Sequence, residues 1–123
     1  MRPAFVLLFA LALSALVSGT EYYAETFDNL DMDAILHSDR LFNQYMDCIL
    51  DRGPCTADGR TLRRILPDAV ASVCARCNPR QQEMAQKIGN HLRNHKPQAW
   101  AKFLRKFDPN EKYVTAFEQF LDS

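Results

Sequence analysis

Hydrophobic residues recur every three to four positions along most of the chain after residue 30. This spacing places them on one face of an α-helix, whereas a half-buried β-strand alternates hydrophobic and polar residues. No stretch of the sequence alternates in that way. The pattern therefore predicts an all-α protein of five or six helices.

The first two predicted helices have clear start and stop signals. Residues 30–37 predict a short helix whose early acids complement the helix dipole. Ser38 or Asp39 can then cap a second helix, whose apolar face extends to Ile49. We expect this helix to stop at the Gly-Pro pair at positions 53–54, because proline cannot continue a helix.

A third helix is predicted to start at Thr56 or Asp58 and to close at the cysteines near residue 75. Pro67 lies inside it, where it removes a backbone donor and clashes with the carbonyl of Arg63. The helix should therefore kink at Pro67 or divide in two.

The remaining elements follow from the same spacing. Residues 78–96 predict a long helix, residues 97–107 a short aromatic helix, and residues 114–121 a last segment that packs as a helix or frays. Residues 21–29 have aromatic and acidic side chains without a clear period. We expect them to lie extended over the body.

The amino terminus has the features of a secretory signal peptide. Arg2 provides a positive start, an apolar run covers residues 4–17, and Ser18 and Gly19 are small. The run is shorter than the roughly 20 apolar residues that span a bilayer, which argues against a membrane anchor. With residues 1–19 as the signal peptide, residues 20–123 fit a single domain.

Charge is unevenly distributed along the chain. Residues 20–59 contain nine acids and two bases, residues 60–106 two acids and eleven bases, and residues 107–123 four acids and one base. The net charges of these segments nearly cancel, which argues against general attraction to nucleic acid. The segregation indicates either a basic face for an anionic partner or acidic ends that fold back over a basic middle, and we favour the second interpretation.

All four cysteines fall in one stretch with the spacing C-x6-C-x18-C-x2-C. In an exported chain this pattern favours disulfides, because the compartment is oxidising. A thioredoxin-like redox site requires a βαβ context that the sequence lacks, and a zinc site is the remaining alternative.

No enzyme chemistry or cofactor is expected. His91 and His95 have the i, i+4 spacing of metal ligands, but no third ligand is evident, so we expect no metal site. The sequence also lacks a nucleophile elbow and a glycine-rich phosphate loop. Tyr45 and Trp100 suit either a pocket for an aliphatic chain or an ordinary core.

Several motifs together resemble one family over nearly all of residues 20–123. They are Leu30-Asp-Met-Asp-Ala-Ile-Leu-His-Ser-Asp-Arg-Leu41, Tyr45-Met-Asp-Cys48, Asp51-Arg-Gly-Pro-Cys55-Thr-Ala-Asp-Gly-Arg60, Leu66-Pro-Asp-Ala69, Cys74-Ala-Arg-Cys77-Asn-Pro-Arg-Gln81, Asn94-His-Lys-Pro-Gln-Ala-Trp100 and Phe107-Asp-Pro109. With the cysteine spacing, these motifs resemble the insect chemosensory proteins of the OS-D type, which include ejaculatory bulb-specific protein 3. Phe27 departs from the family pattern, since the family usually has a tyrosine there. The absence of the tyrosine hydroxyl favours less polar ligands.

The resemblance implies a compact globule around an internal apolar channel, with local disulfides from Cys48 to Cys55 and from Cys74 to Cys77. It also implies a set of residues along or near the channel. The set consists of Phe27, Asp28, Tyr45, Leu62, Ile65, Leu66, Gln81, Met84, Ile88, Trp100 and Leu104.

The function implied is that of a secreted, extracellular and non-enzymatic carrier of fatty-acid derivatives, pheromones or odorants. Transfer of the ligand's apolar surface out of water would drive binding, and a few polar groups of the protein would orient the ligand. We expect a monomer without a nucleic-acid partner or stable membrane insertion, and with a chemoreceptor or another secreted protein as the partner class. The alternative is a secreted interaction protein in development, wounding or immunity, acting through charges such as Arg60, Arg63 and Arg64.

Overall fold

The computed structural model describes residues 21–25 and 28–123, which form six α-helices and no strand. The helices are α2 (Met32–His37), α3 (Asp39–Ile49), α4 (Ala57–Ala71), α5 (Pro79–His95), α6 (Pro97–Phe107) and α7 (Val114–Leu121). The predicted all-α class is confirmed. The predicted signal peptide at residues 1–19 lies outside the described residues, as does Phe27.

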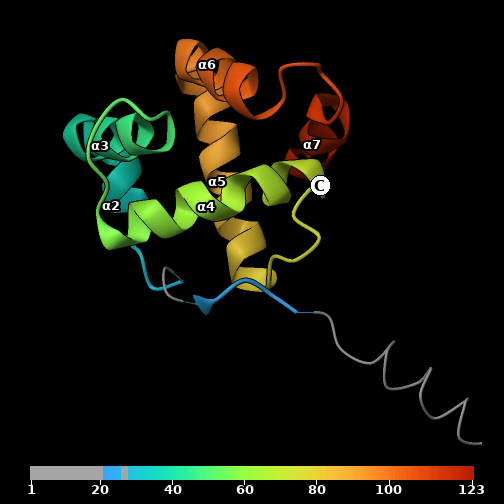
Figure 1. The fold of residues 1–123 in the computed structure, drawn as a ribbon, viewed down its shortest axis with the longest axis horizontal. Coiled ribbons are helices and arrows are strands. Elements are labelled where there is room, and N and C mark those ends of the chain that lie inside the picture. Colours follow the sequence, from blue (N-terminus) through green and yellow to red (C-terminus); the bar gives the residue numbers. More distant parts are fainter. Residues whose placement is uncertain (1–20, 26–27) are drawn as a thin grey trace, which may run out of the picture.

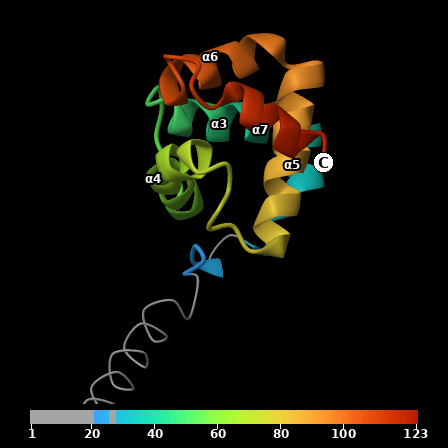
Figure 2. The same cartoon turned by 90° about the vertical axis from the view of Figure 1, so that its right-hand side faces the viewer.

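α5 is the longest of these helices and runs through the middle of the molecule in Figure 1, where α4 crosses in front of it. Figure 2 shows α4 and α5 on opposite sides of the body, with α6 across one end. α2 and α3 lie beside α4 and α5, and α7 lies against α5. The arrangement leaves the apolar faces of α4 and α5 turned toward a shared interior.

Side-chain caps fix where the helices begin. The hydroxyl of Ser38 accepts a hydrogen bond from the amide of Leu41, and that of Thr56 accepts one from Gly59. Of the two cap candidates predicted for each helix, the structure therefore uses Ser38 and Thr56. Such caps satisfy amides that have no partner within the helix.

The predicted end of the second helix was wrong, and of the two outcomes predicted at Pro67 the division does not occur. α3 ends at Ile49 rather than at the Gly-Pro pair, since Asp51 already takes a left-handed backbone conformation with φ of 60°. α4 does not divide at Pro67 but continues to Ala71. Pro67 is exposed, whereas Ala69 and Val70 beyond it are buried in the interior, so packing on the inner face keeps the last turns helical.

The main core is aromatic and aliphatic and draws on five helices, α3 to α7. Its buried members are Phe42, Met46, Ile49, Val70, Leu92, Trp100, Phe103, Phe117 and Leu121. Asp108, which is only 3% exposed, connects α6 to α7. Its carboxylate accepts hydrogen bonds from the amides of Lys112, Tyr113 and Val114, which fixes the chain where it enters α7 at Val114.

Ion pairs join the acidic ends to the basic middle. Asp33 pairs with Lys87, Asp39 with Lys96, Asp51 with both Arg63 and Lys106, and Asp122 with Arg93. The interpretation that the acidic ends fold over the basic middle is thereby confirmed. None of the helices in residues 21–25 and 28–123 is both long enough and apolar enough to cross a membrane.

Candidate functional site

The interior holds a cavity of about 150 Å³ whose surface consists almost entirely of apolar atoms. Every one of the six helices contributes to its wall, and Tyr23 and Leu30 contribute from the segment before α2. α4 and α5 supply the largest shares, because their hydrophobic stripes face each other across it. The predicted apolar interior therefore exists as a space between helices.

Eight of the eleven residues assigned to the channel by resemblance line this cavity. They are Tyr45 on α3, Leu62, Ile65 and Leu66 on α4, Gln81, Met84 and Ile88 on α5, and Trp100 on α6. The structure thus brings together residues that are up to 55 positions apart in the sequence. Whether they contact a ligand stays a prediction.

Two of the other three predicted residues, Asp28 and Leu104, do not line the cavity. Phe27 lies outside the described residues. Asp28 uses its carboxylate to accept hydrogen bonds from the side-chain amides of Asn78 at 2.9 Å and Gln81 at 3.0 Å. Leu104 is partly buried and packs against the main core.

The polar end of Gln81 is already occupied. Its Oε1 accepts a hydrogen bond from the amide of Asn78, which completes a capping box at the start of α5. Its Nε2 donates to the carbonyl of Ala24 at 3.0 Å and to Asp28. Gln81 therefore anchors the segment before α2 and offers the cavity mainly its aliphatic carbons.

Tyr23 was missed by the sequence reasoning, which assigned the segment 21–29 only an extended covering role. Its ring is 7% exposed and lines the cavity, and its hydroxyl donates a hydrogen bond to Asp68 on α4. Burial, followed by this hydrogen bond and the negative charge of Asp68, raises the pKa of Tyr23 to about 12. No periodic signal marks it, because the segment is not helical.

Other cavity residues carried a signal that could not be distinguished from that of a core. Phe42, Met46, Leu92 and Phe117 belong to helical stripes that predict burial, and all four also line the cavity. Spacing shows that a side chain faces inward. It does not show whether other atoms fill the space in front of it.

One of the two disulfides borders the cavity. Cys48 is bonded to Cys55, and Cys74 is bonded to Cys77, which confirms the local pairing implied by the resemblance. Cys74 and Cys77 form part of the cavity wall beside Ala69. The disulfides exclude the zinc alternative for these four thiols.

His91 and His95 on α5 are not among the residues that line the cavity. The His91 ring is 5.8 Å from the Phe42 ring and 5.3 Å from the His95 ring, measured between centroids. Burial, and then the charges of His95, Lys96 and His37, lower the pKa of His91. No group of three metal-ligating side chains occurs in the part of the chain that the structure describes.

Together, the fold and the cavity define a class of small, disulfide-bonded helical proteins that enclose an apolar space. The chain belongs to the family described as the insect pheromone-binding family, A10/OS-D, which matches residues 23–115. The resemblance inferred from the sequence motifs is thereby confirmed.

Individual relatives agree with this assignment. The chain is 38% identical over 102 residues to ejaculatory bulb-specific protein 3 of Drosophila melanogaster, covering 83% of this chain and 81% of that protein. It is 35% identical over 120 residues to allergen Tha p 1 of Thaumetopoea pityocampa, covering 96% of this chain and 95% of that protein. A solved chemosensory protein in complex with bromo-dodecanol has a TM-score of 0.74 and 30% identity, covering 79% of this chain and 97% of that one.

Proposed function

We propose that this protein is a secreted carrier that binds small hydrophobic ligands, such as fatty-acid derivatives, pheromones or odorants, and transports them through aqueous lymph. The observation that carries the proposal is the internal cavity, whose wall draws apolar side chains from all six helices. A related chemosensory protein holds bromo-dodecanol, a long-chain alcohol, which supports an aliphatic ligand for this chain as well.

Transfer of an alkyl chain from water supplies the driving force. Each buried methylene contributes about 0.8 kcal/mol. A chain of about a dozen carbons can offset the loss of translational freedom and reach a Kd on the order of micromolar. Polar groups contribute little inside the cavity, because the amide of Gln81 and the hydroxyl of Tyr23 are already hydrogen-bonded within the protein.

A secreted interaction protein acting through charge is the alternative. Arg60 and Arg64 are exposed on α4, the helix whose opposite face carries Leu62 and Ile65 into the cavity, and Arg63 pairs with Asp51 at 3.1 Å. Alanine at Arg60, Arg63 and Arg64 separates the two functions. A carrier keeps most of its lipid affinity in this variant, whereas a charge-dependent protein loses its partner.

Fluorescence of Trp100, the single tryptophan of the chain, reports on the cavity because its ring is part of the wall. We expect a homologous series of aliphatic alcohols to quench Trp100, to displace a fluorescent lipid probe, and to gain about fourfold in affinity per methylene until the cavity is full. Absence of any response to aliphatic acids, esters and alcohols by folded protein would contradict the proposal.

A further inference from the structure

A second hollow of about 440 Å³ opens on the surface between α3, the loop after it and the start of α6. Its lining includes apolar residues, among them Leu50, Pro97 and Ala99, and its charged residues are mostly basic. We call it the α3–α6 groove. Its size falls within the range of small-molecule sites.

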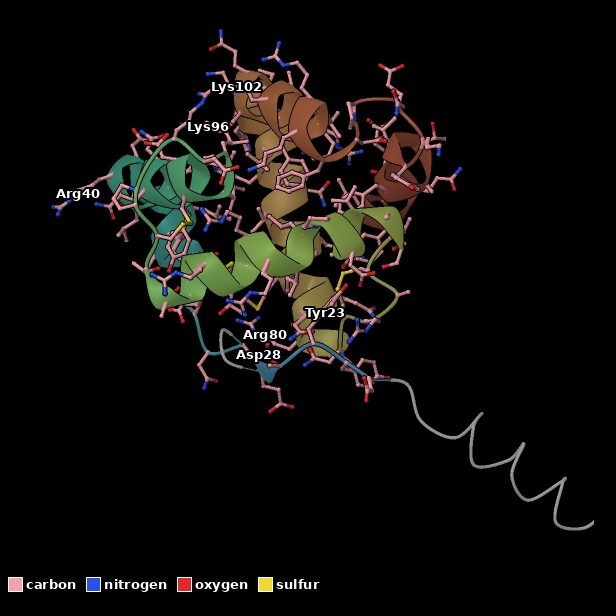
Figure 3. All side chains as sticks on the ribbon, in the orientation of Figure 1. Tyr23, Asp28, Arg40, Arg80, Lys96 and Lys102 are labelled. Atoms are coloured by element: carbon pink, nitrogen blue, oxygen red, sulfur yellow. A yellow bond between two sulfur atoms is a disulfide. The ribbon has the colours of Figure 1, made fainter. Side chains whose placement is uncertain are left out.

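Four basic side chains line the α3–α6 groove: Arg52, His95, Lys96 and Lys102. Figure 3 shows Lys96 and Lys102 on the same side of the molecule. Lys96 is partly neutralised, since its Nζ lies 3.3 Å from the carboxylate of Asp39. Asp47 is the one acid among the lining residues, and within residues 21–25 and 28–123 neither Arg52 nor Lys102 forms an ion pair.

The groove and the internal cavity share a wall. Phe42 and Met46 line both spaces, so these two side chains form part of the boundary between the basic surface groove and the apolar interior. Met46 is an unbranched side chain that can change rotamer at low cost. Its movement would connect the two spaces.

The cavity itself cannot solvate a charge. Its surface is almost entirely apolar, and an ion transferred there without a partner is strongly disfavoured. The charged end of an amphiphile must therefore lie at the edge of the cavity or outside it.

The other edges of the cavity suit an anion poorly. Asp58 lines the wall at the start of α4. At the opposite end, beside Tyr23 and Gln81, lie the carboxylates of Asp28 and Asp68. The cations at that end are already engaged, since Arg76 pairs with Asp68 at 3.8 Å and Arg80 pairs with Glu83 at 3.5 Å. The α3–α6 groove is the edge where cations outnumber acids.

We propose that the α3–α6 groove holds the anionic head group of an amphiphile, such as the carboxylate of a long-chain fatty acid, whose alkyl chain passes between Phe42 and Met46 into the cavity. Arg52 and Lys102 are the cations that bind the head group. This inference rests on the carrier function proposed above and assigns the ligand class and the head-group residues of the same site.

A pair of ligands matched in chain length tests the assignment. Dodecanoic acid is ionised at about pH 8, whereas dodecanol is neutral, so their affinities differ chiefly through the head group. The test variant carries Arg52→Gln and Lys102→Gln. The control variant carries Arg64→Gln and Lys112→Gln, which remove the same charge from exposed positions outside the groove.

We expect the Arg52→Gln/Lys102→Gln variant to bind dodecanoate about three- to tenfold more weakly while its affinity for dodecanol stays within about twofold. The control variant should leave both affinities within about twofold, and added salt should weaken dodecanoate binding by the wild type more than dodecanol binding. The single variant Lys102→Glu should lower dodecanoate affinity further than Lys102→Gln.

Two results overturn the inference while leaving the carrier function intact. One is an unchanged affinity of the Arg52→Gln/Lys102→Gln variant for dodecanoate. The other is an equal loss of affinity for dodecanoate and dodecanol in that variant. If the wild type binds neither ligand, the carrier function itself is wrong, and the head-group assignment falls with it.

Discussion

The hydroxyl of Tyr23 donates a hydrogen bond to the carboxylate of Asp68, which joins the segment before α2 to the last turn of α4. The guanidinium of Arg76 lies 5.1 Å from the centroid of the Tyr23 ring and also pairs with Asp68 at 3.8 Å. The amide of Tyr23 donates to the carbonyl of Arg76 at 3.0 Å. These contacts hold an irregular segment against one end of the cavity.

Removing the Tyr23 hydroxyl should loosen this end of the molecule. We expect Tyr23→Phe to lower the free energy of unfolding by about 1 kcal/mol at neutral pH, because Asp68 loses a hydrogen-bond donor in a partly buried site. Urea denaturation measures the loss. Tyr22→Phe is the matched control, since Tyr22 is 56% exposed, and an equal loss in both variants would contradict the role given to Tyr23.

The same tyrosine makes stability depend on alkaline pH. Its pKa of about 12 in the folded protein exceeds the value of about 10 expected when unfolded, so the folded state holds the phenolic proton more tightly. The resulting stabilisation is complete below about pH 10 and is lost as the pH rises toward 12. Absorbance titration should show a late-ionising phenol that is missing in Tyr23→Phe, and an unchanged titration would be inconsistent with this account.

His91 should make the protein less stable in acid. Its Nε2 is buried without a hydrogen-bond partner among the described residues, and its pKa is lowered by burial and by the charges of His95, Lys96 and His37. The unfolded state then binds the proton more readily, so stability is unaffected above the unfolded pKa of about 6.5 and is lost as the pH falls from there toward the lower folded pKa.

Thermal unfolding between about pH 7 and pH 5 measures this effect. We expect His91→Phe, which keeps a ring against Phe42, to lose less stability over that interval than the wild type. The same decline in both proteins would show that His91 is not responsible.

Gly89 lets α5 and α7 approach closely. A Cβ atom at this position would lie 2.5 Å from Cδ2 of Leu121 and 3.0 Å from its Cδ1, and Leu121 is only 4% exposed. We expect Gly89→Ala to cost about 1–3 kcal/mol through overpacking, reduced by up to about 1 kcal/mol through the better helix propensity of alanine.

A double-mutant cycle isolates this contact. In a Leu121→Ala background the new methyl group has space, so Gly89→Ala should be neutral or stabilising there. An equal loss of stability in both backgrounds would rule out the clash as the cause.

Most helices of the fold could be predicted from the sequence, because their stripes and caps are local signals. Ser38 and Thr56 illustrate this, since each supplies a side-chain oxygen just before an amphipathic run. Pro67 shows the limit of local reasoning. The proline weakens the helix, but the buried residues beyond it keep the last turns helical, and that packing depends on the other helices.

The site could be predicted only in part, and for a related reason. Leu62 and Ile88 were assigned to a channel through the resemblance, while Phe42 and Leu92, which also line the cavity, looked like ordinary core residues. Tyr23 had no helical period, and its position depends on contacts with Asp68 and Arg76, which are 45 or more residues away. A cavity is a property of how six helices meet, which no single helix encodes.

The carrier function depends most directly on the space in front of Ala69, which is 9% exposed and lines the cavity on α4. The measurement is the affinity of Ala69→Leu for dodecanol, compared with that of Ala71→Leu, whose added isopropyl group lies on the exposed end of the same helix. If the cavity holds the alkyl chain, Ala69→Leu should bind at least tenfold more weakly while remaining folded, and Ala71→Leu should bind like the wild type. Equal affinities of a folded Ala69→Leu variant and the wild type would contradict binding in the cavity.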